Sequence, residues 1–253
     1  MPQWHEHFEM KLILSGSVEI FCGTELFVAS AGDVVIINPY EPHGMRLCND
    51  GELNYYLLML SPDFPFSPSL ADRYSELFEG KLSFNRLLSG CKAVNDTFTA
   101  LFDELIDQPP EYELRAESYI ALLYTALLRH AKSDGNPEEH ANLKEYGERI
   151  RPALNHIYFH YMEEITVPEL AKLCAMSVYH FCRIFKNVIG CTAVAYINAL
   201  RLNKAILLLT TTKMSIGEIA AAVGFPDVFY FSRRFKAEKG ISPSEYRAAK
   251  LSV

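Results

Sequence analysis

The chain of 253 residues lacks any cysteine pair spaced as CxxC and any apolar run of 18 residues. Its six cysteines are scattered, which is typical of reduced thiols and not of a disulfide framework. The sequence also lacks a basic start followed by an apolar stretch, so it predicts neither a membrane span nor a secretion signal. We therefore expect a cytoplasmic protein that binds no membrane.

Charge is distributed unequally along the chain, although the net charge of −7 looks unsuited to a nucleic-acid partner. Residues 1–143 contain 22 acidic and 9 basic side chains, whereas residues 144–253 contain 15 basic and 9 acidic ones. A basic half joined to an acidic half is expected when one domain meets phosphates and the other does not. The length fits two domains of ordinary size.

A stretch near the C-terminus, residues 215–247, repeats an earlier stretch at an offset of 49 to 50 residues. Each copy opens with a capping box, formed by Thr166 and Glu169 in the first and by Ser215 and Glu218 in the second. A short helix, a turn and a second helix with basic side chains follow in both copies. Each copy is therefore predicted to be a helix-turn-helix, and the repetition makes the prediction specific.

The segment between the two copies, residues 192–210, is predicted to be one continuous helix because its apolar residues recur with helical spacing. Such a helix would be roughly 28 Å long at 1.5 Å per residue. Successive major-groove segments on one side of a duplex lie about 34 Å apart. The two basic helices are thus expected to reach adjacent groove segments.

Residues 5–60 read as short strands separated by glycines, which predicts an antiparallel barrel or sandwich. Alternation in the first strand places Glu9 and Lys11 on one face, with Phe8, Met10 and Leu12 on the other. The polar face predicts a pocket for a small organic ligand. Its candidate residues are Trp4, His5, His7, Glu9, Lys11, Tyr40, His43 and Tyr56.

The remainder of the N-terminal half is predicted to be largely helical. Residues 62–92 read as irregular with one short helix, and amphipathic helices are expected over 94–107 and 116–132. The second of these has enough apolar surface for a helix–helix dimer interface, and packing on the strands is the alternative. Residues 132–143, rich in polar residues with a glycine and a proline, are predicted to be a linker.

The N-terminal region resembles the cupin fold in its pair His5 and His7 and in the later motif GDVVIINPYEPHG, which ends near His43. In metal-binding cupins a glutamate follows the second histidine by four or five residues. Lys11 and Leu12 stand at those positions, so we expect no metal and no cofactor. A metal held by His5, His7 and His43 is the alternative.

The C-terminal region resembles the AraC/XylS family of transcription regulators in four elements: RLNKAILLL, SIGEIAAAVGF, FSRRFK and the ending GxSPxEYR. The resemblance implies a DNA-binding domain over residues 144–253, a linker over 132–143, and an effector-binding and dimerisation domain over 1–131. The expected fold is an antiparallel cupin-like barrel with a helical pair, followed by an all-α domain with two helix-turn-helix units joined by a long helix.

The resemblance also implies which residues face DNA. In the first recognition helix these are Val178, Tyr179, Cys182 and Arg183, with His180 near the backbone and Lys186 as a further cation. The corresponding residues of the second helix are Val228, Phe229, Ser232, Arg233 and Lys236. Valine and phenylalanine there can make only apolar contacts, for example with thymine methyl groups.

The sequence therefore predicts a homodimeric, non-enzymatic transcription regulator that binds double-stranded DNA and responds to a small-molecule effector, such as a sugar. Activation and repression both remain open, and the resemblance implies RNA polymerase as a further partner. Two alternatives remain. One is a metal-dependent cupin enzyme fused to a DNA-binding domain, and the other is a regulator whose barrel only dimerises.

Overall fold

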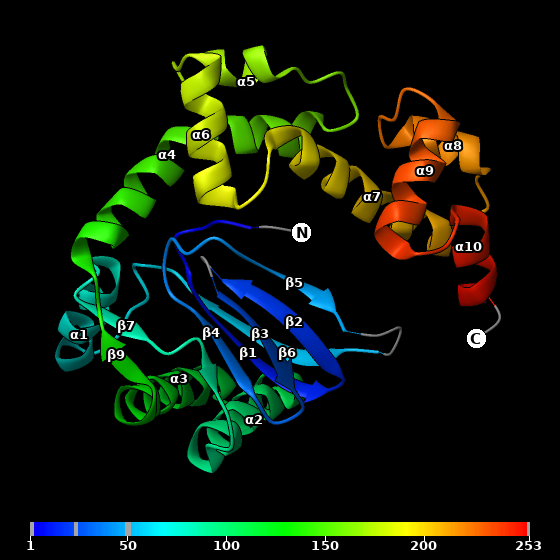
Figure 1. Ribbon diagram of the computed structural model, residues 1–253. Coiled ribbons are helices and arrows are strands. Elements are labelled where there is room, and N and C mark those ends of the chain that lie inside the picture. Colours follow the sequence, from blue (N-terminus) through cyan, green and yellow to red (C-terminus); the bar gives the residue numbers. More distant parts are fainter. Residues whose placement is uncertain (1–2, 23–24, 49–51, 252–253) are drawn as a thin grey trace. The chain divides into compact units, whose positions relative to one another are not determined.

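The chain forms two compact units, residues 2–148 and 149–253. The computed structural model describes residues 3–22, 25–48 and 52–251. Figure 1 shows the strands gathered in the N-terminal unit and helices alone in the C-terminal one. The expected fold class is confirmed: an antiparallel β unit with a helical pair precedes a helical unit with two helix-turn-helix motifs.

The β structure consists of antiparallel sheets in the order β6-β1-β4-β8, β3-β2-β5 and β7-β9. Strand β5 was not predicted as a separate element, because residues 39–42 were read as part of the strand before them. The strands are β1 (Phe8–Ser15), β2 (Ser17–Cys22), β3 (Glu25–Ser30), β4 (Val34–Ile37), β5 (His43–Leu47), β6 (Asn54–Leu60), β7 (Leu82–Phe84), β8 (Leu87–Leu88) and β9 (Lys132–Asp134).

The two faces of β1 serve two different cores, as its alternation predicts. Phe8, Met10 and Leu12 pack with the helices, whereas Ile13 packs between the two larger sheets. Simple alternation would place Leu14 with the first group, but its side chain is 42% exposed. The pairing of β1 with β6 shifts register between Ile13 and Ser15, and such a bulge turns the side chain out of the alternation.

The expected helical pair is confirmed as α2 (Lys92–Asp107) and α3 (Tyr112–His130), which pack on each other and on the outer face of the four-stranded sheet. The segment before them is more regular than predicted. It contains the expected helix, α1 (Pro68–Phe78), but also β7 and β8, which pair with β9 and β4.

Residues 132–143, predicted to be a linker, are structured. Residues 132–134 form β9, and α4 (Pro137–His160) begins three residues later and continues across the boundary between the two units. The polar residues that looked like a linker start this helix, since the side chain of Asn136 accepts a hydrogen bond of 3.2 Å from the amide of Glu139. Pro152 lies inside the helix.

The C-terminal unit contains the end of α4 and six further helices, and α7 runs through it as the predicted long helix. By length and mean hydropathy, α7 is the one helix among the described residues that could cross a membrane. Its buried side chains pack in the cores of the unit. The helices are α5 (Val167–Leu173), α6 (Val178–Ile189), α7 (Ala193–Thr211), α8 (Ile216–Ala222), α9 (Val228–Lys239) and α10 (Pro243–Leu251).

Candidate DNA-binding surface and ligand site

The first helix-turn-helix consists of α5 and α6, and local hydrogen bonds determine where both helices begin. The Thr166 side chain accepts from the Glu169 amide at 3.3 Å, and the Glu169 carboxylate accepts from the Thr166 amide at 3.4 Å. Ser177 caps α6 by accepting from the amide of His180. The buried Ala171 allows the two helices to approach closely.

The second helix-turn-helix repeats this construction in α8 and α9. Ser215 and Glu218 exchange the same pair of hydrogen bonds, at 3.2 and 2.7 Å. Asp227 caps α9 by accepting from the amide of Tyr230 at 2.7 Å. Ala220 is buried at the position equivalent to Ala171 in the first copy. Both predicted capping boxes, and the duplication itself, are confirmed.

The turns of the two copies also share a backbone conformation. Ala175 has φ +52° and Gly224, at the equivalent position, has φ +85°. A positive φ costs a side-chain-bearing residue free energy that glycine avoids. The same turn is therefore built in one copy with glycine and in the other against the preference of alanine.

Most of the predicted DNA-facing residues are exposed on α6 and α9, but Val228 packs against the core that contains Phe231 and Phe235. Tyr179 is 80% exposed and Phe229 is 78% exposed, at equivalent places in the first turn of each helix. The two exposed aromatic side chains occupy the same place in both copies of the repeat. Val178, Cys182, Arg183, Lys186, Arg233 and Lys236 are also exposed, whereas His180, Val228 and Ser232 are half-buried.

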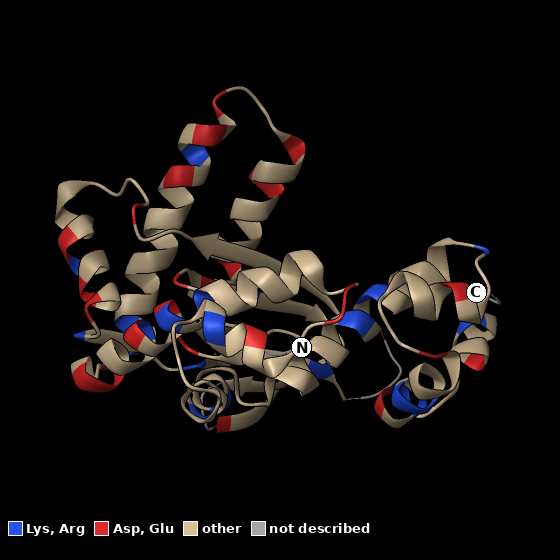
Figure 2. Cartoon of the chain, turned by 90° about the horizontal axis from the view of Figure 1, so that it is seen from above, with Lys and Arg blue, Asp and Glu red and all other residues tan. Residues whose placement is uncertain are grey.

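Figure 2 colours the lysine and arginine residues along the ribbon. Both recognition helices contain such residues. Arg183 and Lys186 project from α6, and Arg233, Arg234 and Lys236 project from α9. Cationic groups beside exposed apolar ones, on two equivalent helices, suit a surface that contacts both phosphates and base edges.

The predicted polar pocket corresponds to a cluster of side chains around Glu9 of β1. The Glu9 carboxylate forms an ion pair with Lys11 through Oε1, and His5 Nε2 lies 3.1 Å from Oε2. His43, the first residue of β5, places Nε2 at 3.8 Å from the same Oε2. Glu9, Lys11 and His43 are buried, and His5 is half-buried.

The two imidazoles of this cluster are neutral at pH 7. Burial lowers the pKa of His5, and the charge of Lys11 lowers it further. Burial lowers the pKa of His43 to about 3, with an added contribution from His5. His43 Nδ1 lies 2.9 Å from the carbonyl oxygen of Glu41, which can only accept a hydrogen bond. Nδ1 therefore carries the proton, and Nε2 presents a lone pair towards Glu9.

Trp4 and Tyr40 lie together at the N-terminal part of α4, with ring centroids 5.8 Å apart. His140 of α4 contacts the edge of the Tyr40 ring at 5.2 Å, and the Lys144 ammonium lies 5.4 Å from its centroid. The Trp4 indole also closely approaches Gly147. These two candidates thus connect the N-terminal segment with α4.

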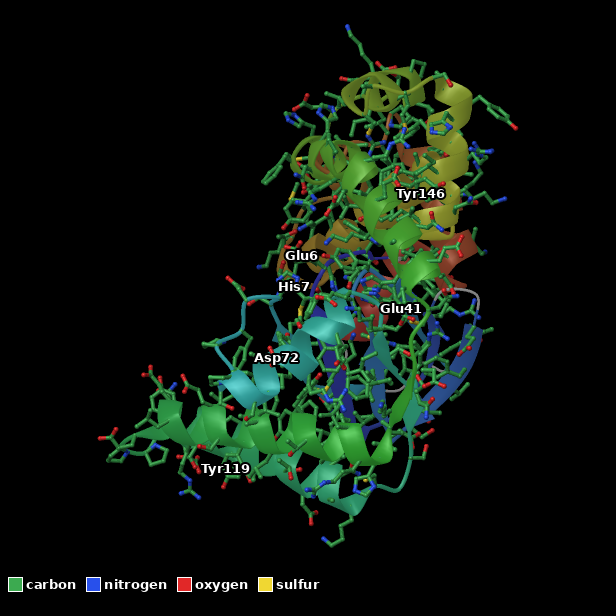
Figure 3. The ribbon with its side chains drawn as sticks, turned by 90° about the vertical axis from the view of Figure 1, so that its left-hand side faces the viewer. Glu6, His7, Glu41, Asp72, Tyr119 and Tyr146 are labelled. Atoms are coloured by element: carbon green, nitrogen blue, oxygen red, sulfur yellow. The ribbon has the colours of Figure 1, made fainter. Side chains whose placement is uncertain are left out.

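One ligand candidate, Tyr56, lies apart from the Glu9 cluster. Tyr56 pairs with Leu12, so its side chain is on the helix-facing side of the sheet, where it stacks on Phe102 with centroids 4.2 Å apart. The structure therefore does not bring Tyr56 together with the other ligand candidates. The ring of His7 lies 5.6 Å from that of His5. Figure 3 shows His7 and Glu41 between Tyr146 of α4 and Tyr119 of α3.

Sequence reasoning missed a second polar network that positions the turn before His43. Arg86 donates to Glu41 at 2.8 Å, and Cys22 Sγ donates to the same carboxylate at 3.1 Å. The Asn38 side chain bonds the backbone of Phe84 in both directions, at 2.8 and 3.0 Å. These partners are far apart in sequence and follow no spacing motif, so only the fold reveals them.

Buried His43 is expected to make the protein sensitive to acid. Below its ordinary pKa of 6.5 the unfolded chain takes up a proton that folded His43 excludes down to about pH 3. The free energy of unfolding should therefore fall with pH, by about 2 kcal/mol between pH 7 and pH 5. Urea unfolding in the presence of a chelator measures this, and His43→Gln should remove most of the slope. The exposed His130→Gln is the control, and an unchanged slope in His43→Gln would contradict the assignment.

Comparisons with known proteins agree with this architecture. Residues 170–249 match a family model described as a helix-turn-helix domain, and residues 1–124 match an AraC-like ligand binding domain. The arabinose operon regulatory protein of Salmonella typhimurium is 35% identical over 248 residues, covering 98% of this chain and 85% of that protein. An uncharacterised HTH-type regulator of Bacillus subtilis, YdeC, is 26% identical over 96% of this chain and 84% of its own length.

Among solved structures, a ligand-free single-residue variant of ToxT from Vibrio cholerae matches 97% of this chain and 90% of its own with a TM-score of 0.52, at 17% identity, which is a likeness of fold. The relatives from Salmonella typhimurium and Bacillus subtilis are both named as regulators, the first of an operon and the second of transcription. The paired helix-turn-helix units, the β unit before them and the whole-length similarity lead to one conclusion: the chain belongs to the AraC family of DNA-binding transcription regulators and carries an AraC-like ligand-binding domain.

Proposed function

We propose that the chain is a cytoplasmic, homodimeric regulator that reads two adjacent major-groove segments with α6 and α9, under the control of a small molecule bound near Glu9. The observation that carries the DNA part is the exposure of equivalent aromatic and basic side chains on both helices. Tyr179 and Phe229 are largely exposed in the C-terminal unit, and each lies one turn before an exposed arginine.

The length of α7 supports simultaneous contact with two groove segments. Its 19 residues span roughly 28 Å at 1.5 Å per residue, close to the groove repeat of about 34 Å. Selection of duplexes from a random pool by the full-length chain tests this. The expected product has two preferred blocks whose centres lie about 10 base pairs apart. A single short block, or binding that enriches no sequence, would contradict the proposal.

The proposed effector site lies on the face of the four-stranded sheet that carries Glu9 and Lys11. Register places Met59 opposite Glu9 and Leu57 opposite Lys11, so these four side chains share one face. Leu57 and Met59 are 40% and 41% exposed, although they adjoin buried charges. A ligand that covers them would contact apolar groups on one side, and the carboxylate, ammonium and imidazoles on the other.

A thermal and chemical stability screen of the full-length chain against sugars and small metabolites tests the effector site. A ligand present at a hundred times its dissociation constant should add about 2.7 kcal/mol to the free energy of unfolding. Glu9→Gln should abolish the gain, whereas Glu117→Gln, a matched change on the exposed side of α3, should preserve it. Ligand stabilisation that survives Glu9→Gln would place the site elsewhere, and no stabilising ligand would favour the alternative that the β unit only dimerises.

Contacts between the ligand candidates and α4 give the effector a route to the rest of the chain. Tyr40 lies in the turn that leads to His43, and its ring contacts His140 and Lys144 of α4. A ligand that moves this turn would displace α4 at its N-terminal part. Because α4 continues into the C-terminal unit, we propose it as the element that carries the response.

We propose that a second copy of the chain packs on the outer face of the helical pair. Leu114 and Leu122 of α3 are 62% and 57% exposed and are two turns apart, so they lie on the same side of the helix. Ile106, near the end of α2, is 64% exposed. Exposed leucines that gather on one side of a helix are a surface that a second subunit could cover. If the chain binds as a dimer, the selected duplexes should contain two copies of the pair of preferred blocks.

A further inference from the structure

We propose that His5, Glu9 and His43 form a binding site for a first-row divalent transition metal such as Zn²⁺, Co²⁺ or Ni²⁺. The inference does not depend on the DNA-binding function. It rests on the arrangement of three ligating side chains, on the proton position of His43, and on a buried lone pair to which no group among the described residues donates.

The ligating atoms converge at a spacing that suits such an ion. His5 Nε2, Glu9 Oε2 and His43 Nε2 all lie within 4.8 Å of one another. A tetrahedral ion with bonds of about 2.1 Å holds its ligand atoms about 3.4 Å apart. The separations from Glu9 Oε2, 3.1 Å to His5 and 3.8 Å to His43, bracket that value. Two imidazoles and one carboxylate are also the donors that zinc and its neighbours prefer over magnesium or calcium.

His43 is already arranged as a metal ligand. Its Nδ1–H donates to the carbonyl of Glu41 at 2.9 Å, which fixes the ring and directs the Nε2 lone pair at Glu9 Oε2. A hydrogen bond of this kind, on the nitrogen remote from the metal, is the usual support of ligating histidines. The turn that supplies the carbonyl is itself held by Arg86 through the Glu41 side chain.

The lone pair of His43 faces another acceptor across 3.8 Å of buried space. Within residues 3–22, 25–48 and 52–251 no group donates to His43 Nε2. Glu9 Oε2 is within hydrogen-bonding distance of His5 Nε2, at 3.1 Å, but His43 Nε2 is a buried acceptor without a donor. Such an orphaned acceptor is unfavourable, and a cation or a bridging water would satisfy it. A metal ion would also bind His5 Nε2, so removing the His5 imidazole should weaken metal binding. A water held between Glu9 and His43 would produce no saturable metal binding at all.

Lys11 is expected to limit the affinity of the site for a divalent ion. Its ammonium is paired with Oε1 of Glu9, so Oε2 is left for the ion. The same positive charge repels a divalent cation only a few ångströms away. Removing the Lys11 ammonium should therefore strengthen metal binding, whereas removing an imidazole should weaken it. The two changes affect the same observable in opposite directions, which a purely structural role of the cluster would not produce.

Titration calorimetry on the untagged, chelator-treated full-length chain tests the proposal, with ZnCl₂ as the probe and the visible absorption of bound Co²⁺ as a second readout. One ion per chain is expected, with the affinity reduced at least about 100-fold in His43→Gln or His5→Gln. Lys11→Met should raise the affinity about tenfold, and His130→Gln should leave it unchanged.

His5→Gln, at a half-buried position, keeps the test decisive if His43→Gln fails to fold. The absence of saturable binding would overturn the proposal, as would zinc affinity that is equal in the wild type, His5→Gln and Lys11→Met. Binding of metal with no effect on operator affinity leaves the metal assignment standing. Loss of operator selection in the wild type would refute the DNA-binding proposal alone.

Discussion

Replacing Gly224 by alanine is expected to destabilise the C-terminal unit by about 3 kcal/mol, because strain and steric overlap add. The φ of +85° disfavours any side chain. A Cβ atom would also lie 2.6 Å from the carbonyl oxygen of Met162 and 2.7 Å from that of Tyr161. Both are backbone atoms that cannot move by changing a rotamer.

The backbone around those carbonyls is held in place from α7. The Arg201 guanidinium donates to the carbonyls of Tyr161 and Glu163, at 2.7 and 2.6 Å, so the turn after α4 is fixed where the new methyl group would enter. Relaxation of this turn would break these bonds. We therefore expect the overlap in Gly224→Ala to persist and to lower the free energy of unfolding.

The duplication supplies the matched control. Ala175 occupies the equivalent turn position with φ +52°, so Ala175→Gly should raise the free energy of unfolding by about 0.5 kcal/mol, as relief of strain exceeds the added freedom of the unfolded chain. Urea unfolding of the full-length variants, followed by circular dichroism, measures both. A loss below about 1 kcal/mol in Gly224→Ala would show that the turn can relax.

Removing the side chains of Tyr179 and Arg183 together should weaken binding to the selected operator by about 3 kcal/mol, or roughly 150-fold, with little change on unrelated duplexes. Arginine and tyrosine can form hydrogen bonds to base edges, each worth about 1–3 kcal/mol of discrimination. The corresponding variant on α9, lacking the side chains of Val228 and Phe229, loses apolar contacts alone. It should cost about 1–2 kcal/mol and relax operator choice less.

Fluorescence anisotropy at several salt concentrations separates base reading from phosphate contact. If Arg183 holds a phosphate, its loss should weaken all duplexes alike and reduce the salt slope by about 1. Arg129→Ala, on the exposed end of α3 in the N-terminal unit, removes the same charge outside the recognition helices and controls for net charge. Equal relaxation of operator choice by the α6 and α9 variants would refute the division of roles.

The helix-turn-helix units were predictable because their boundaries are determined locally. Each capping box joins residues three apart, and the apolar spacing that buries Phe181 and Phe231 is visible in the sequence itself. The face of β1 that carries Glu9 was predictable for the same reason. Contacts over such short distances in sequence are encoded by spacing, and repetition confirmed the pattern.

The features that could not be predicted depend on partners distant in sequence. The strand within residues 132–143 was not predicted because β9 is stabilised by β7, about 50 residues earlier. Tyr56 looked like part of the polar face, but its pairing with Leu12 assigns it to the other side. The search for a carboxylate after His7 used a spacing from other proteins, whereas the fold brings Glu9 to His43 from two different sheets.

Pro152 gives the long α4 helix a defined place at which it can bend. In an α-helix the amide of residue 152 would donate to the carbonyl of residue 148, and proline has no amide hydrogen to donate. Residue 148 is the last residue of the N-terminal unit. The missing bond therefore coincides with the boundary between the units. We therefore expect any bending of α4 to occur at this position, because a proline interrupts the helical hydrogen bonds there.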